Sequence, residues 1–294
     1  MTMDYDLTLE DEKEPIRMVY YGDPGTRKTS YMAAMSQLGK VVHIDAEEGL
    51  KPTALRRLGI DVSNIIPVRR VTYMKLEDLM YEWLDIIAKG NDLPFIGINF
   101  DSATAMIDRF ISGVVDSQVR KADAKGEDRA RWKVYQEDYG DMTNQIKNLL
   151  RGYRDLPVHL CIAAHAKREK DEEGAVRIGP SVNPAVRDAI SVYSDLILNT
   201  DIVAAPGYLK GLGYARTQTI GKFDGKDRFG VLPKNMINPT FPRVLQYVEG
   251  DLEWPGGDEE QAAGAKAMKG ETSPEPAEAS DTPTNTDEPS DSKE

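Results

Sequence analysis

Residues 16–30 (IRMVYYGDPGTRKTS) join a short apolar run to a glycine-containing loop and a lysine–threonine pair. In a strand–loop–helix unit, backbone N–H groups of such a loop surround a phosphate chain, the lysine contacts the outer phosphates, and the hydroxyl binds Mg²⁺. The N-terminal end of the following helix adds positive potential. The candidate nucleotide contacts are Gly22, Asp23, Pro24, Gly25, Thr26, Arg27, Lys28, Thr29 and Ser30. The alternative is an ordinary Pro-Gly turn before a helix.

One position departs from the usual phosphate-loop pattern G-x-x-x-x-G-K-[ST]. Arg27 stands where the pattern has the glycine before the lysine, and a glycine there lets the backbone approach the phosphates closely. Arg27 fits if its side chain points outward or adds a cation near the phosphates; otherwise it weakens nucleotide binding or hydrolysis. Hydrolysis therefore depends on this position, whereas the fold does not.

Three further polar residues follow apolar runs. Asp101 follows residues 94–100 and is placed to hold Mg²⁺, although it could also cap the next helix. Glu47 follows residues 40–45 and is the candidate for activating the attacking water, with Glu48 as its competitor. His165 follows residues 158–164 and either senses the γ-phosphate or is structural. The three histidines and one cysteine form no zinc-binding pattern.

Alternating apolar and amphipathic segments predict an α/β fold with a mostly parallel central sheet flanked by helices. The carboxyl ends of parallel strands meet at one edge of a sheet, so we expect the polar residues above to converge. Residues 75–89 have a clear helical period, with Trp83 in the core. Strands are also expected at 195–199 and 215–220. Residues 117–133 lack an apolar period and are expected to be a loop, and 167–183 to be a functional loop or hairpin.

The net charge of −12 is unevenly distributed. Residues 258–294 hold eleven Asp and Glu against three Lys, a net charge of −8. Their composition predicts disorder. We therefore expect an acidic flexible arm at 1–14, one core at 15–255 and a disordered acidic tail at 256–294. The chain has no apolar stretch of membrane-spanning length, and its one cysteine, Cys161, is expected to be a buried, inert thiol in a reducing cytoplasm.

The stretch from Ile44 to Ile65, with Asp45-Ala-Glu47 and Leu58-Gly-Ile-Asp61, resembles the equivalent stretch of bacterial RecA. In RecA an acidic residue at this strand end activates the hydrolytic water, and the match falls on Glu47. Asp101-Ser102 is similar to the RecA magnesium-site Asp-Ser. His165 lies where RecA-like proteins keep a polar residue that reports nucleotide state to the following DNA-binding loop.

Residues 15–243 more closely resemble phage RecA-like ATPases of the Sak type, which are single-strand annealing proteins or minimal recombinases. The resemblance rests on GDPGTRKTS, Asp101-Ser102, Tyr139-Gly140, Ala164-His165-Ala166-Lys167 and Gly225-Lys-Asp-Arg228. It implies a RecA-like P-loop NTPase core that uses ATP with Mg²⁺ and binds single-stranded DNA. It also implies assembly into homo-oligomeric rings or filaments, a single-strand binding protein as a possible partner, and the host cytoplasm as the location.

In such assemblies a basic residue of the neighbouring protomer completes the nucleotide site. The resemblance implies Lys226 or Arg228 for this role, with Lys222 in reserve, although all three could be solvated turn residues. DNA would meet two mobile loops within 117–133 and 167–183. The candidate contacts are Arg120, Lys121, Arg129, Arg131, Trp132, Lys133, Lys167, Arg168 and Arg177, with Trp132 stacking on bases. The second loop is not strongly basic, because 166–177 holds four Lys and Arg against four Asp and Glu.

These features predict a DNA-dependent ATPase of phage recombination. One alternative is a helicase-type motor on a RecA core. Another is a nucleotide-gated single-strand-binding scaffold with negligible hydrolysis, which Arg27 favours. A metabolic phosphate-loop kinase is the fourth possibility, and the Glu47 stretch argues against it.

Overall fold

The computed structural model describes residues 14–130, 132–170, 174–204 and 211–252. Within these residues a ten-stranded sheet has the order β10-β8-β7-β1-β5-β4-β2-β3, with β6 pairing with β5 and β9 with β7. The strands are β1 (Arg17–Gly22), β2 (Val41–Asp45), β3 (Ile65–Val68), β4 (Gly97–Asp101), β5 (His159–Lys170), β6 (Val176–Pro180), β7 (Leu196–Val203), β8 (Leu212–Arg216), β9 (Lys226–Asp227) and β10 (Asn235–Ile237).

The six strands β7, β1, β5, β4, β2 and β3 are mutually parallel. Antiparallel β8 and β10 extend the β7 side of the sheet. The helices are α1 (Lys28–Ala33), α2 (Pro52–Arg57), α3 (Tyr73–Ala88), α4 (Ala103–Lys125), α5 (Gln136–Arg154), α6 (Pro184–Tyr193) and α7 (Phe241–Val248), with 3-10 segments η2 (Ala34–Gln37) and η3 (Val62–Asn64). The predicted α/β class is confirmed.

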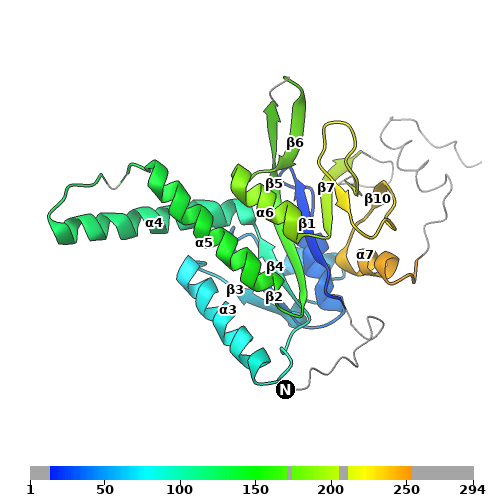
Figure 1. Cartoon of the computed structure of the whole chain (residues 1–294). Coiled ribbons are helices and arrows are strands. Elements are labelled where there is room, and N and C mark those ends of the chain that lie inside the picture. Colours follow the sequence, from blue (N-terminus) through cyan, green and yellow to red (C-terminus); the bar gives the residue numbers. More distant parts are fainter. Residues whose placement is uncertain (1–13, 131, 171–173, 205–210, 253–294) are drawn as a thin grey trace, which may run out of the picture.

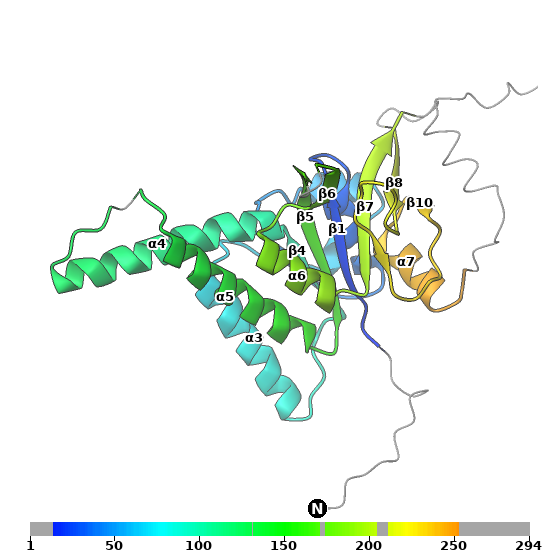
Figure 2. The ribbon, with the colours of Figure 1, turned by 45° about the horizontal axis from the view of Figure 1, so that its top comes forward.

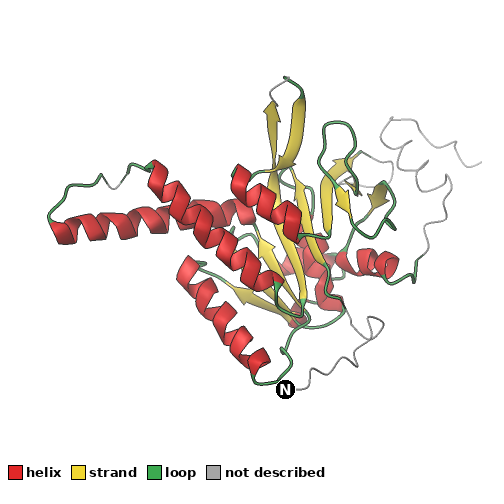
Figure 3. Ribbon diagram, viewed as in Figure 1, coloured by secondary structure: helices red, strands yellow, loops and turns green. Residues whose placement is uncertain are grey.

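Helices cover both faces of the sheet (Figures 1 and 3). Helices α3, α4, α5 and α6 share one hydrophobic cluster with alternate residues of the strands, such as Ile98 and Phe100 of β4. Helices α1 and α7 share a second cluster with Met18 and Tyr20 of β1 on the other face. Strands buried on both faces require this continuous apolar composition.

The apolar stripe of α3 produces the contact predicted from its helical period. Leu76, Met80 and Trp83 are its buried residues, and Thr72 caps its first turn by accepting a hydrogen bond from the backbone N–H of Lys75. The Trp83 ring meets Phe95 and Tyr153 edge-on. Trp83 is therefore a core residue, as predicted.

Two parts of the chain project from the sheet (Figures 1 and 2). One is an arm formed by α4 and α5. The expectation of a loop from 117 is wrong for residues 117–125, because α4 continues to Lys125. Val115, Val119 and Ala122 keep a narrow buried stripe, and Gly126 ends the helix with a φ of 72°. A stripe this narrow in a charged segment hides the helical period in the sequence.

The second projection is the hairpin of β5 and β6, which pair from Ala166–Pro180 to Lys170–Val176. This pairing confirms the hairpin that is one of the two expectations for residues 167–183. The expected strand at 215–220 is wrong beyond Arg216, where β8 ends.

Residues 1–13 of the predicted N-terminal arm lie outside the described residues, and so does the whole of the predicted acidic tail, 256–294. No helix in the described part of the chain is long and apolar enough to cross a bilayer. Cys161 is buried as predicted, and burial raises the pKa of its thiol.

The start of β1 depends on a neutral histidine. The backbone N–H of Ile16 donates to Nδ1 of His159 at 3.0 Å, so this nitrogen must be unprotonated. Burial, together with the nearby Arg17, lowers the pKa of His159 from 6.5 to about 4.

We therefore expect the free energy of unfolding to fall as the pH decreases from 6.5 to 4, because the unfolded chain binds a proton there that the folded chain excludes. Chemical denaturation across this pH range measures the effect. The variant His159→Gln, whose amide oxygen can still accept the bond, should show a shallower decline. Parallel pH curves for the parent and the variant would contradict this assignment.

Candidate nucleotide-binding site

The register of the parallel strands brings their carboxyl ends together. Gly22 of β1 lies opposite His165 of β5, and Asp45 of β2 lies opposite Asp101 of β4. The loop after β1 leads directly into α1 at Lys28. Strand, loop and helix thus occur in the predicted order at the edge where a ligand is expected.

The loop after β1 is fastened to strand β7. A Cβ at Gly22 would lie 2.3 Å from the carbonyl oxygen of Thr200, so this close approach requires glycine. The hydroxyl of Thr26 lies 2.9 Å from the Thr200 hydroxyl and donates to the carbonyl of Asp23. These contacts of Gly22, Asp23 and Thr26 therefore fix the loop on the side that faces β7, and none of the three residues lines the cavity.

Arg27 adopts the backbone conformation that the usual glycine provides. Its φ is 67° and its ψ is 17°, in the left-handed region. Its guanidinium donates to the carbonyl oxygen of Gly211, at the start of β8, at 2.9 Å. The side chain therefore extends from the loop to the residue before β8, and Arg27 also borders the cavity described below.

Lys28 lies inside the loop. Its ammonium donates to the carbonyls of Gly22 and Asp23 at 2.9 and 3.0 Å. Burial lowers the pKa of Lys28, and the carboxylates of Asp101, Glu47 and Asp23 oppose that shift. These carbonyl contacts hold the cation where a phosphate chain would meet it.

Thr29 and Asp101 form a pair of oxygen ligands. The Thr29 hydroxyl donates to Oδ2 of Asp101 at 2.7 Å, and Nε2 of His43 lies 3.5 Å from the same oxygen. Burial alone would raise the pKa of Asp101, but His43, Thr29 and Lys28 lower it below its ordinary value. A carboxylate beside a hydroxyl matches the hard oxygen ligands that Mg²⁺ prefers.

The alternative that Asp101 caps the following helix is wrong, because Ser102 caps it. Ser102 is the N-cap of α4, and its Oγ accepts a hydrogen bond from the backbone N–H of Ala105 at 3.3 Å. The Asp101 carboxylate is thus left for Thr29 and its surroundings.

Of the acidic residues after β2, only Glu47 borders the cavity of this site. Its Oε1 accepts a hydrogen bond from Ser102 and lies 3.1 Å from Nε2 of His165. Glu48 has a φ of 56° and pairs with Arg109 at 3.1 Å instead. The carboxylate of Asp45 accepts bonds from the backbone N–H groups of the following turn.

His165 connects the cavity with the β5–β6 hairpin. Its backbone N–H donates to the Thr104 hydroxyl at 3.1 Å, and its carbonyl accepts from the N–H of Ser181 at 2.7 Å. Its ring faces Glu47. Both the start of α4 and the end of the hairpin therefore hold the strand at this residue.

Together these residues line a cavity of about 630 Å³, a size typical of small-molecule sites. Sequence reasoning missed the residues that extend the cavity beyond the phosphate loop: Ala54, Arg57, Leu58 and Ile202. Leu58 is 54% exposed and forms an apolar wall on which a base could stack. Their proximity was not visible in the sequence, because α2 and β7 reach the site only through the sheet topology.

The two residues expected to act on a neighbouring protomer lie elsewhere. Lys226 donates to the carbonyls of Ser191 and Ser194 at 2.8 and 2.7 Å, and Arg228 pairs with Asp195 at 3.0 Å. Lys226 lies on β9, which pairs with the first residues of β7, and Arg228 directly follows β9, so both lie at the end of the sheet opposite the cavity. Their role between protomers stays a prediction. The reserve candidate Lys222 lies on the cavity side, beside Asp23 and Arg168.

The candidate DNA contacts divide into free and engaged side chains. Arg120 and Lys121 lie exposed on α4, and Trp132 beyond it is 86% exposed. Arg129 instead pairs with Glu137 and the buried Asp138, and Lys133 lies over the Tyr135 ring. In the hairpin, Arg168 and Arg177 are exposed, while Lys167 pairs with Glu169 at 2.7 Å. Arg131 lies outside the described residues.

The left-handed backbone of Arg27 allows a direct stability test. Arg27→Gly and Arg27→Ala both remove the bond to Gly211, but only alanine retains a Cβ in the strained conformation. We expect Arg27→Ala to be less stable than Arg27→Gly by about 1 kcal/mol in urea denaturation.

The matched control is the same pair of substitutions at Arg56, an exposed residue of α2. There the order should reverse, because glycine is the poorer helix former. Equal stability of the two Arg27 variants would show that the loop does not impose a left-handed residue.

The comparisons with known proteins agree with this geometry. No curated protein gives a significant match. A family model described as an AAA domain matches residues 14–229, which is most of the chain and includes every residue of the cavity. The chain therefore belongs to this AAA domain family of P-loop NTPases.

Proposed function

We propose that this protein is a Mg²⁺-dependent ATPase that binds single-stranded DNA and promotes annealing or recombination in phage DNA metabolism. Membership of the AAA domain family indicates nucleotide binding and hydrolysis in general. The assignment as a Mg²⁺-dependent ATPase is supported by one observation above all: Lys28, Thr29, Asp101, Glu47 and His165 border the same cavity. The resemblance to Sak-type proteins supplies the DNA partner.

Each of these residues has a role that follows from its position. Backbone N–H groups of the loop and the Lys28 ammonium bind the phosphate chain of ATP. Thr29 and Asp101 would hold Mg²⁺, which when bound neutralises charge that develops on the phosphates. Glu47 accepts a proton from, or orients, the attacking water.

The contact between Glu47 and His165 supports coupling of the nucleotide to DNA. His165 lies on β5, two and three residues before Lys167 and Arg168 in the projecting hairpin. A change at Glu47 on hydrolysis would alter its contact with His165, and β5 carries that change into the hairpin. In this proposal the protein acts as a homo-oligomeric ring or filament, with a single-strand binding protein as a further partner.

A second function is a scaffold that binds ATP and DNA but hydrolyses ATP negligibly. The observation that favours it is Arg27, whose side chain ties the phosphate loop to β8 at Gly211. Because Arg27 replaces the glycine that usually lets the loop approach the phosphates closely, it favours binding without turnover.

We expect Glu47→Gln to lower ATP turnover at least 100-fold while nucleotide affinity stays within about threefold, because only the proton-accepting carboxylate is lost. Lys28→Ala should lose both affinity and turnover. ATP hydrolysis and nucleotide titration, each with and without single-stranded DNA, measure these effects. The matched control is Glu48→Gln, since Glu48 pairs with Arg109 outside the cavity.

Turnover that persists in Glu47→Gln would contradict the assigned role of Glu47. Turnover that is absent from the parent but present in Arg27→Gly would support the scaffold function. Failure of the parent to bind nucleotide would overturn both.

The acidic segment 258–294 should compete with DNA for basic side chains, since it carries a net charge of −8. We expect its deletion to tighten binding of single-stranded DNA, most strongly at low salt. Anisotropy titrations over a salt series measure this effect. Unchanged affinity at every salt concentration would show that the segment does not compete.

A further inference from the structure

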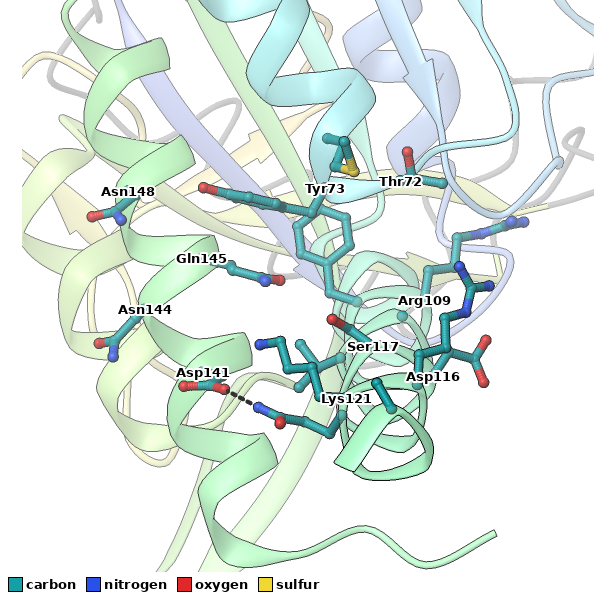
Figure 4. Close-up of a pocket in the computed structure, with 17 residues that line it drawn as sticks. Thr72, Tyr73, Arg109, Asp116, Ser117, Lys121, Asp141, Asn144, Gln145 and Asn148 are labelled. Carbon is teal, nitrogen blue, oxygen red and sulfur yellow. Dashed lines mark hydrogen bonds between the residues drawn. The ribbon is translucent and has the colours of Figure 1, made fainter. Parts of the chain in front are cut away.

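A second cavity, of about 850 Å³, lies in the arm between α4 and α5 and is closed at one end by the start of α3 (Figure 4). Its lining residues on α4 run from Arg109 to Ala124. At 1.5 Å per residue this stretch of α4 is about 22 Å long, whereas the lining residues of α5, from Asp141 to Asn148, span about 10 Å. An elongated groove suits a linear polymer better than a compact small molecule.

The α5 wall of this groove carries amide side chains. Asn144, Gln145 and Asn148 make no side-chain hydrogen bond to any other described residue. Figure 4 shows Gln145 extending into the space between the helices, toward Lys121. Each amide offers both donors and an acceptor, which matches the mixed donor and acceptor edges of nucleobases.

The remaining walls carry an aromatic side chain and two cations, the groups that contact the bases and phosphates of a single strand. The half-buried ring of Tyr73 on α3 gives an aromatic end, and it packs edge-on against the buried Phe110 of α4, with ring centroids 5.9 Å apart. Arg120 and Lys121 border the groove, and neither has an ion pair with a described residue. Aromatic surfaces stack on bases, and cations contact phosphates.

An extended peptide is a poorer occupant. Recognition of an extended peptide commonly uses an unpaired strand edge that supplies backbone hydrogen bonds, whereas helices, whose backbone groups bond internally, form the walls here. The charged lining residues also balance closely, since Asp116 and Asp141 oppose the cations. The groove therefore suits contact with bases more than attraction to charge alone.

We propose that the groove between α4 and α5 is a base-binding site for single-stranded DNA, in which the α5 amides bond base edges and Arg120 and Lys121 contact the backbone. This inference rests on the proposed function. It differs from the expected loop contacts, because bases rather than phosphates provide most of the binding. The groove also ends at Arg109, which donates to the carbonyl of Ala46 at 2.7 Å, beside Glu47, and so adjoins the nucleotide site.

The test measures binding of the full chain to two labelled 20-mers by fluorescence anisotropy: a mixed-sequence strand and a fully abasic strand with the same phosphates. We expect the double variant Gln145→Ala with Asn148→Ala to bind the normal strand about tenfold more weakly, with abasic binding unchanged. Lys121→Ala should weaken binding of both strands and reduce the salt slope by about one.

The matched control replaces two exposed amides away from the groove, Asn91→Ala with Gln246→Ala, and should bind both strands like the parent. Equal thermal melting temperatures verify that the variants are folded. Unchanged binding by the groove variant, or equal weakening for both strands, would overturn the base-binding groove alone. A parent chain that binds neither strand would overturn the proposed function as well.

Discussion

The parallel register of the central sheet is the constraint on which the rest of the structure depends. Pairing of Gly22 with His165, and of Asp45 with Asp101, aligns the carboxyl ends of β1, β2 and β4 with His165, which lies inside β5. Because these strands are buried on both faces, a shift of one residue in any pair would exchange side chains between the two clusters and separate the paired polar residues. The same burial that stabilises the sheet therefore places the polar residues around one cavity.

Arg27 shows how a departure from the usual phosphate-loop sequence is accommodated by a residue far away in the chain, Gly211. The loop requires a left-handed residue there, and a non-glycine residue adopts this conformation only at a cost. The bond from its guanidinium to Gly211 offsets part of that cost. The phosphate loop, which in the usual pattern depends only on its own glycines, is here attached to the antiparallel side of the sheet.

The two projections carry candidate DNA contacts and point in different directions from the sheet (Figure 1). The β5–β6 hairpin continues from His165, and the α4–α5 arm begins at Ser102, which bonds Glu47. Both projections thus start at residues that touch the same carboxylate. The Glu47 carboxylate therefore contacts both residues from which the two projections start, Ser102 and His165.

The sequence by itself determined the fold class, the phosphate loop and the end of a strand at Asp101, because apolar runs and loop composition are local properties. The strand expected to end at His165 instead continues to Lys170 as part of the hairpin. The sequence left Glu47 and Glu48 as competitors and Asp101 as a possible cap. Only the tertiary structure separated them, since the Glu48–Arg109 pair and the Ser102 cap depend on α4. The sequence also concealed the helical segment 117–125, because its buried stripe is narrow. The cavity wall at Leu58 and the amide groove needed the tertiary structure too, because side chains from separate elements meet there only after the sheet and helices have packed.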